Sequence, residues 1–147
     1  MEITETRDGW TLSFKDGRVR LIQIDFRLTF LIVDGSDRVW LHVETPGRLK
    51  TGATETTFVP AQAVTLAPLL TFFNAIIRNI RIGKTGELAS EFEQDQFMLV
   101  EPDKAYEAWQ IECSAEEGEL MLVCPPGGDV ALFRDSNIPR RVDSLHS

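Results

Sequence analysis

The sequence predicts an α+β fold of mainly antiparallel strands, about seven to nine of them, with one short helix near residues 65–74. Three observations predict it. Apolar and polar residues alternate along several short segments, and this period of two is typical of half-buried strands. Gly, Asp and Pro separate these segments as turn residues do. The pattern changes to a helical one at a single place, TLAPLLTFFN (65–74).

The length of 147 residues is that of one ordinary domain. We expect a single globular domain over 1–135 and a flexible C-terminal tail over 136–147, where few apolar residues are available for burial. The first ten residues include three acids and no apolar run, so we expect no signal peptide. No apolar stretch approaches the ~20 residues that span a bilayer, so we expect a cytoplasmic protein without membrane contact.

The first half predicts a series of strands and turns. WTLSFK (10–15) alternates cleanly, and Asp16-Gly17 behind it is a strong hairpin-turn signal. In order, we expect a strand at 10–15, a turn at 15–18, an extended run at 19–33 with a bend near Asp25, a turn at 34–37, a strand at 39–44, a flexible loop at 45–56 and a short edge strand ending at Pro60.

The helix over 65–74 would have Thr65 as its N-cap and Asn74 as its C-terminal cap. Its apolar stripe would consist of Leu66, Leu69, Leu70 and Phe73. After it we expect strands at 75–82, 87–92 and 97–101, a hairpin over 106–124 and a last strand at 130–133. The predicted core contains Trp10, Phe14, Leu28, Phe30, Leu70, Phe73, Phe92, Trp109, Ile111 and Leu122.

A weak internal repeat relates residues 19–46 to residues 77–102. Val19-Arg20-x-Ile22-x-Ile24 parallels Ile77-Arg78-x-Ile80-x-Ile82, and Val43-Glu44 parallels Val100-Glu101. Two explanations stay open: any two β-meanders share such a skeleton, or the fold consists of two related meanders around one core.

The net charge of −8 is concentrated in one part of the chain. Between Thr85 and Glu119 there are eleven acidic residues and one basic residue, Lys104. Such a block repels phosphate backbones and attracts cationic surfaces, so we expect no nucleic-acid partner. It is either a solvated face or a docking surface for a basic protein partner. Candidate surface residues are Glu101, Asp103, Tyr106, Glu107, Glu112, Glu116, Glu117 and Glu119.

Catalytic and metal-site patterns are nearly absent. His42 and Glu44 lie two apart on one strand and therefore point the same way, which is half of a metal site. Only Glu101 could complete it, if the repeat brought the two strands together. No G-x-S-x-G elbow is present, and GKTG (83–86) lacks the spacing of a phosphate loop. We expect no catalytic residue, no metal and no cofactor.

The two cysteines lie in the hairpin that includes Trp109. A turn at SAEEGE (114–119) pairs Cys113 with Leu120, Ile111 with Leu122 and Trp109 with Cys124, which puts all six side chains on one face. The sulfurs would then be over ~10 Å apart along the ladder, too far for a disulfide. We therefore expect both thiols to be inert packing groups. In PPGG (125–128), we expect the prolines to end the strand and the glycines to allow a tight return.

The second half resembles a family of small bacterial proteins of unknown function. The resemblance is carried by the helix over 66–73, GELASEF (86–92), VEPDKAYEAW (100–109) and PGGDVALF (126–133), and it covers about residues 17–133. Tyr106-Glu107-Ala108-Trp109 and the following Pro-Gly-Gly are its specific parts. The sequence departs from the family pattern in its doubled proline and in EQDQ (93–96), where a glycine turn is more usual. The resemblance implies no assigned activity, and small acidic bacterial proteins of this kind include immunity proteins that neutralise toxins.

Together these observations predict a non-catalytic binding protein with an acidic surface for a basic partner, in an immunity or regulatory role. The alternative is a small-molecule-binding or weakly catalytic β-rich domain with a pocket near Tyr106, Glu107 and Glu101. A third expectation is a homodimer formed through an exposed strand edge.

Overall fold

The structure, a computed structural model, describes residues 1–116 and 118–134. Over these residues it confirms a mainly antiparallel fold with one short helix, but the strands number twelve rather than seven to nine. The tail expected at 136–147 lies outside the described residues. The elements are β1 (Glu2–Thr6), β2 (Gly9–Ile24), β3 (Leu28–Asp34), β4 (Asp37–Val43), β5 (Gly47–Thr51), β6 (Thr54–Phe58), the 3-10 helix η1 (Ala63–Phe72), β7 (Ile76–Gly83), β8 (Leu88–Phe92), β9 (Gln96–Val100), β10 (Trp109–Ala115), β11 (Gly118–Cys124) and β12 (Ala131–Arg134).

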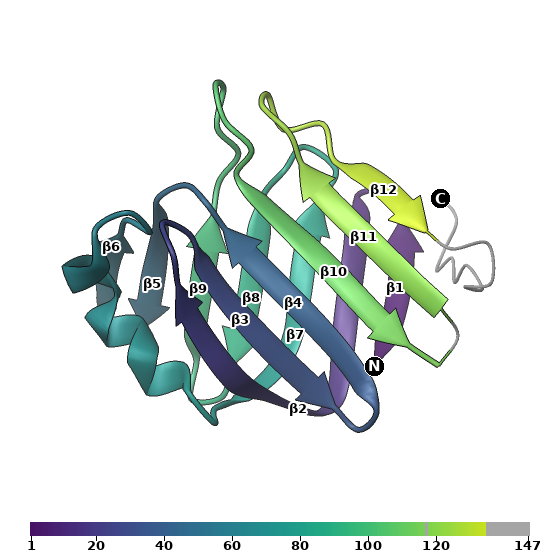
Figure 1. Ribbon diagram of the computed structural model, residues 1–147, viewed down its shortest axis with the longest axis horizontal. Coiled ribbons are helices and arrows are strands. Elements are labelled where there is room, and N and C mark those ends of the chain that lie inside the picture. The colour runs from purple at the N-terminus through teal and green to yellow at the C-terminus, as the bar shows by residue number, and fades with distance from the viewer. Residues whose placement is uncertain (117, 135–147) are drawn as a thin grey trace.

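The strands form two stacked layers (Figure 1). Their hydrogen-bonded order is β12-β11-β10-β4-β3-β2-β7-β8-β9-β5-β6, with β1 also paired to β2. We call the layer of β12, β11, β10, β4, β3 and the second half of β2 the front sheet, and the remaining layer the back sheet. The long strand β2 joins them, since residues 9–13 pair with β1 and β7 whereas residues 18–24 pair with β3. Within the described residues no helix has the length and apolar character needed to cross a membrane.

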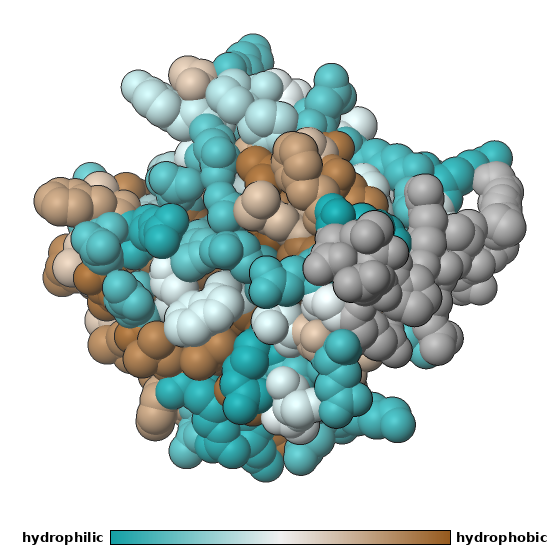
Figure 2. Space-filling view, turned by 45° about the vertical axis from the view of Figure 1, so that its right-hand side comes forward, coloured by the Kyte–Doolittle hydropathy of each residue, from teal (hydrophilic) through white to brown (hydrophobic). Residues whose placement is uncertain are grey.

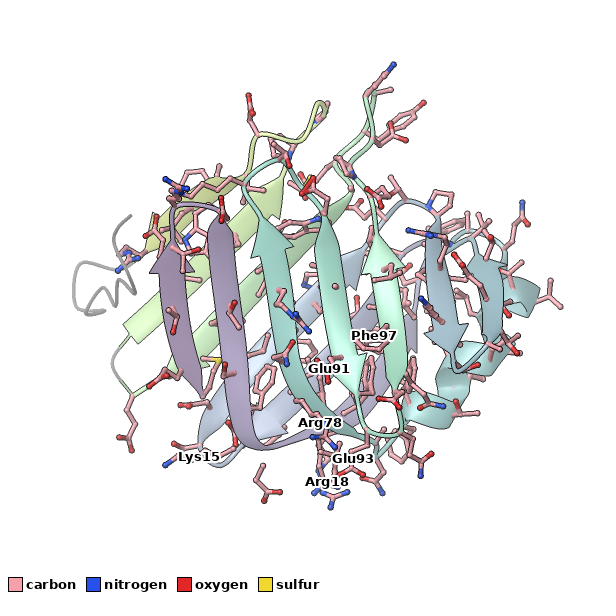
Figure 3. The ribbon with its side chains drawn as sticks, turned by 180° about the vertical axis from the view of Figure 1, so that it is seen from behind. Lys15, Arg18, Arg78, Glu91, Glu93 and Phe97 are labelled. Atoms are coloured by element: carbon pink, nitrogen blue, oxygen red, sulfur yellow. The ribbon has the colours of Figure 1, made fainter. Side chains whose placement is uncertain are left out.

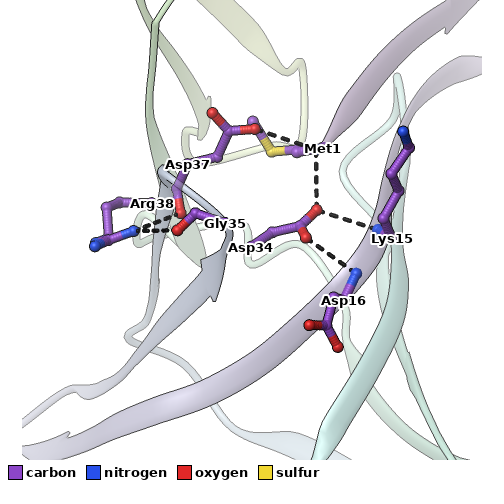
Figure 4. Close-up of polar contacts among 7 residues, drawn as sticks. All are labelled: Met1, Lys15, Asp16, Asp34, Gly35, Asp37 and Arg38. Carbon is purple, nitrogen blue, oxygen red and sulfur yellow. Dashed lines mark hydrogen bonds and ion pairs between the residues drawn. The ribbon is translucent and has the colours of Figure 1, made fainter.

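The turn predicted at residues 15–18 is wrong, because β2 continues through it and bends from one sheet to the other. The Asp34 carboxylate accepts the backbone N–H groups of Lys15 and Asp16 at 3.1 and 3.0 Å (Figure 4). It thereby replaces the ladder bonds that the strand loses where it changes partners. A β-carbon on Gly17 would lie 2.7 Å from that of Phe14, so the glycine serves the close packing of this corner.

The same carboxylate binds the amino group of Met1 at 2.9 Å, and Asp37 binds that group at 3.1 Å. Burial raises the pKa of Asp34, but the hydrogen bonds from the amino group and from the two backbone N–H groups outweigh burial and leave its pKa lowered. For Met1, burial lowers the pKa of the amino group, whereas the two aspartates raise it and prevail. This ion cluster fixes the β3–β4 turn against β1 and β2.

Two meanders, β2–β3–β4 and β7–β8–β9, share the same irregularity. In the first, Val19 pairs with Ile32 and Leu21 with Leu31, so that Arg20 is the extra residue of a bulge. In the second, Ile77 pairs with Phe92 and Asn79 with Glu91, so that Arg78 is extra. The two bulges therefore coincide with the alignment of the sequence repeat.

Each meander is followed by a hairpin that extends the other one. The hairpin β5–β6 pairs with β9, and the hairpin β10–β11 pairs with β4. The strand order is therefore two-fold-like about the β2–β7 contact. The flexible loop predicted at 45–56 is wrong, because most of it forms β5 and β6; the threonines of β6 are exposed at a sheet edge and show no apolar alternation.

The helix closes the open side between the sheets, but its buried face differs from the prediction. Leu66, Leu69 and Phe72 are buried, whereas Leu70 and Phe73, expected in the core, are 49% and 56% exposed. The reason is the 3-10 geometry, which brings every third residue to one face instead of the 3.6-residue period of an α-helix.

The two residues expected to cap this helix have different positions in the structure. Thr65 is not the N-cap, a position held by Gln62. Its hydroxyl instead bonds with the backbone of Val59, directly after β6. Asn74 follows the C-cap with a φ of 68°, the left-handed conformation that often ends a helix.

The core fills the space between the sheets. Phe72 stacks on Phe92 at 3.9 Å, and both rings meet Phe30 edge-on. Of the other predicted core residues, Phe14 is partly buried, and Trp10, Leu28, Trp109, Ile111 and Leu122 are buried.

The predicted register of the β10–β11 hairpin is confirmed: Cys113 pairs with Leu120, Ile111 with Leu122 and Trp109 with Cys124. Both cysteines are buried and free. Burial raises the pKa of Cys113 to about 12 and that of Cys124 to about 11, so neither thiol ionises near neutral pH.

Candidate functional site

The acidic block does not form one continuous patch. Asp103, Tyr106 and Glu107 lie in the loop between β9 and β10, which projects at the top of Figure 1. Glu116 and Glu119 lie at the opposite end of β10 and β11, and Glu117 is outside the described residues. The seven residues of β10 separate the two groups by about 20 Å.

Glu101 and Asp103 both have structural partners. Glu101, at the end of β9, pairs with Arg48 at 3.3 Å and remains 62% exposed. The Asp103 carboxylate accepts the backbone N–H groups of Ala105 and Tyr106 at 2.7 and 3.0 Å, so it holds its own loop in shape. Tyr106 itself is 70% exposed.

Glu107 has a different environment, because it meets Glu44. The backbone N–H of Glu44 donates to the carbonyl of Ala108 at 2.9 Å, which brings the end of β4 beside the start of β10. Burial, and after it the charge and side-chain hydrogen bonding of Glu44, raise the pKa of Glu107. Arg27 and His42 oppose this shift without cancelling it. We call Glu44 and Glu107 the carboxylate pair.

His42 lies next to this pair on the outer face of the front sheet. It is buried, and its Nδ1 lies 2.8 Å from the Thr29 hydroxyl while its Nε2 lies 2.8 Å from a Glu112 carboxylate oxygen. Because a carboxylate only accepts, Nε2–H donates to Glu112, and in the neutral ring Nδ1 accepts from Thr29. Thr29, His42 and Gln110 are direct neighbours across β3, β4 and β10, which positions the ring.

The sequence prediction missed both partners of His42, since they come from other strands. The register of β4 against β10 puts His42 opposite Gln110, two residues from Glu112, and only that register could have identified the contact. Glu101, the partner considered from the repeat, is paired elsewhere. Residues 1–116 and 118–134 contain no group of three or more His, Cys, Asp or Glu side chains placed to hold a metal ion.

The outer face of the back sheet presents paired charges. Arg81 binds Glu91 at 2.9 Å and Arg48 binds Glu55 at 2.7 Å. A groove of about 330 Å³ crosses this side, and Glu101 lines it together with Trp10 and Glu87. Tyr106 and Glu107 do not line that groove. Figure 3 shows this face, with Lys15, Arg18, Arg78 and Glu93 near its lower end.

The most specific sequence motifs meet at one structural point. The Trp109 indole N–H donates to the carbonyl of Gly86 at 2.8 Å. A β-carbon on Gly86 would lie 2.9 Å from the Cys124 sulfur and 3.0 Å from the α-carbon of Gly128. Gly86, Trp109, Cys124 and Gly128 therefore form a close-packed unit that joins β8, β10 and the loop after β11, and folding accounts for them.

Comparison of the chain with curated proteins and with solved structures finds no match in either. A family model described as "Family of unknown function (DUF6188)" matches residues 10–134, which is most of the chain. The resemblance noted from the second half therefore extends through the first half as well, and the chain belongs to the DUF6188 family.

Proposed function

We propose that the protein is a non-catalytic binding protein whose carboxylate pair receives a lysine or arginine of a basic protein partner. The observation that carries this proposal is the meeting of Glu44 and Glu107 at the surface with a raised pKa for Glu107. Two carboxylates held together repel each other, and a partner's cation between them would relieve that repulsion.

The surroundings of the pair suit such a contact. Tyr106 is adjacent in sequence and largely exposed, so its ring is available to the stem or charge of a cationic side chain. The net charge of −8 would accelerate the approach of a basic protein and disfavour nucleic acid. Binding should therefore weaken as salt rises.

We place this activity in an immunity or regulatory role in a bacterial cytoplasm. This part of the proposal rests on analogy with small acidic bacterial proteins that neutralise toxins, and fold alone does not determine function. Glu101, Asp103, Glu112, Glu116, Glu117 and Glu119 would contribute the surrounding field.

The test is affinity capture of host proteins at low and moderate salt with three baits. The baits are the wild-type protein, Glu44→Gln/Glu107→Gln, and Glu116→Gln/Glu119→Gln as a control with the same charge change at the far end of β10. We expect a basic protein that the wild type and the control retain and the first variant loses. If both variants lost the captured protein equally, the overall negative charge and not the carboxylate pair would be responsible for binding. If no bait captured a protein, that result would oppose the proposal.

A second candidate is the small-molecule-binding or weakly catalytic domain, which the groove beside Glu101 favours. The groove has room for a small ligand between Trp10 and Glu87, and the carboxylate pair does not line it. A ligand screen by thermal shift separates the two candidates. A stabilising ligand whose effect disappears in Glu101→Gln and persists in Glu107→Gln would support the second candidate.

A further inference from the structure

Most of the exposed large apolar side chains gather on two neighbouring parts of the fold. Leu21, Ile24 and Phe26 lie on the second half of β2 and the turn after it, whereas Leu70 lies on η1 and Phe73 is the C-cap of that helix. Phe26 is 86% exposed and Phe73 56%. Figure 1 shows η1 beside this part of β2, and brown side chains gather on the corresponding left-hand side of Figure 2. Exposed apolar groups that gather in this way mark interaction surfaces more often than scattered ones do.

The same part of β2 is an unpaired strand edge. Residues 21–24 pair with β3 on one side, whereas pairing with β7 ends at Arg18. Val19 forms the last contact on the open side, through bonds with Asn74 and Ala75. Among the described residues, no backbone group bonds to 21–24 from that side. A row of free N–H and C=O groups next to apolar side chains is a template for an added strand.

The two-fold-like arrangement shows what covers such an edge. Ile22 and Ile24 correspond to Ile80 and Ile82 in the second meander, since they occupy the same register relative to the bulges. There, residues 9–13 of β2 pair along β7, and Ile82 is 2% exposed. Ile24 has no such cover and is 41% exposed. The edge of β2 thus lacks the strand that its counterpart possesses.

The positive charges around the unpaired β2 edge indicate which kind of segment could bind there. Arg18 and Arg20 donate to the backbone and side-chain oxygens of Asn74, respectively, which directs both guanidinium groups toward the start of the edge. In the described chain, neither arginine forms an ion pair, nor does Arg78 nearby. Unpaired arginines favour carboxylates, because the guanidinium fork matches them.

A single extended segment suits this place better than a second copy of the chain. Each copy carries η1 beside its own β2 edge (Figure 1), so a two-fold pairing of the edges would have to accommodate two helices. A single extended segment would have to accommodate only one. It would lie over Leu70 and Phe73, which its inward side chains would cover.

We propose that the β2 edge binds an extended segment of a partner protein, with alternating apolar residues and with acidic residues next to Arg18 and Arg20. The main-chain hydrogen bonds would supply affinity. The exposed apolar side chains beside the edge and the two arginines would supply specificity. The β2 edge would bind an acidic segment, whereas the carboxylate pair would bind a basic partner.

The test uses two labelled peptides and fluorescence anisotropy. One is Glu-Glu-Val-Thr-Val-Thr-Val-Glu-Glu, and the other has lysines in place of the four glutamates. We expect the acidic peptide to bind at least tenfold more tightly than the lysine peptide, and Arg18→Glu/Arg20→Glu to reverse that preference. Hydrogen exchange of residues 20–24 should slow when the acidic peptide binds, which reports strand pairing directly.

The matched variants are Phe73→Asp and Phe133→Asp, since both rings are 56% exposed and Phe133 lies on the other edge of the front sheet. We expect at least a tenfold loss of peptide affinity in the first and no change in the second. The proposal is overturned if neither peptide binds, if both bind equally, or if both phenylalanine variants lose affinity alike. A dimer in sedimentation that Ile24→Asp dissociates would also overturn it, in favour of a second copy.

Discussion

The Trp109 indole N–H donates to the carbonyl of Gly86 at 2.8 Å, between residues that lie 23 positions apart. This bond joins the back sheet to the front sheet at the point where the loop after β11 returns. Gly128 lies against the same place, since a β-carbon there would be 2.4 Å from the carbonyl oxygen of Thr85. The Trp and Pro-Gly-Gly motifs of the family resemblance are thus parts of one packing unit.

Gly128→Ala should therefore destabilise the protein severely, by more than about 3 kcal/mol, because it adds a clash to an unfavourable φ of 97°. Gly127→Ala is the control, because Gly127 has a similar φ of 92° but nothing within 4 Å of its β-carbon. That variant should lose only about 1–2 kcal/mol. Urea unfolding followed by tryptophan fluorescence gives both values, and equal losses would refute the packing argument.

The Thr29–His42 bond predicts a non-additive pair of substitutions. Thr29→Val leaves the buried imidazole nitrogen without a partner and should cost about 1–3 kcal/mol of unfolding free energy. Thr29→Val/His42→Phe removes both polar groups and should cost less than the sum of the two single variants. Glu112→Gln should cost little, because its side chain is 48% exposed and water can replace the contact. Additive losses in a double-mutant cycle would show that the two residues do not interact.

Asp34 predicts a loss of stability in acid. Its pKa in the folded protein is below its ordinary value of 3.8, so its contribution is complete above that value and disappears as the pH falls through the folded pKa. Asp34→Asn should lower the unfolding free energy at pH 7 by about 2–3 kcal/mol and flatten the dependence on pH below about 4. Asp16→Asn, an exposed neighbour that uses only its backbone N–H, should behave as the wild type. An unchanged acid profile in Asp34→Asn would contradict the role of the ion cluster.

The sequence predicted features that depend on contacts within one hairpin, and it missed features that depend on contacts between distant segments. The pairing of Trp109 with Cys124 followed from side-chain parity, because any one-residue slip would move six apolar groups to water. The bend at Asp16-Gly17 was predicted as a turn, because the carboxylate that replaces its ladder bonds comes from Asp34 in another hairpin. The polar strand β6 was predicted as a loop, because an edge strand with both faces exposed shows no alternation.

The site was the least predictable part, because its residues come from strands that are distant in sequence. Glu107 is a candidate surface residue from the sequence, but its partner Glu44 follows β4 in the first meander, and His42 and Glu112 lie 70 positions apart. The sequence repeat aligned the bulges at Arg20 and Arg78 correctly, yet it could not show that each following hairpin joins the opposite meander. Long-range strand pairing decides these contacts, and it leaves no local pattern.

The carboxylate pair predicts a variant that is more stable and less functional. The folded pKa of Glu107 is raised, so its ionised form opposes folding, and stability should increase as the pH falls through that pKa. Glu107→Gln removes the repulsion and should raise the unfolding free energy at pH 7 by a few tenths to about 1 kcal/mol. Glu116→Gln, in an exposed turn, should leave the unfolding free energy unchanged. A stabilised Glu107→Gln that no longer retains a basic partner would separate loss of binding from loss of folding, whereas a destabilised variant would show that the two carboxylates do not repel in the native state.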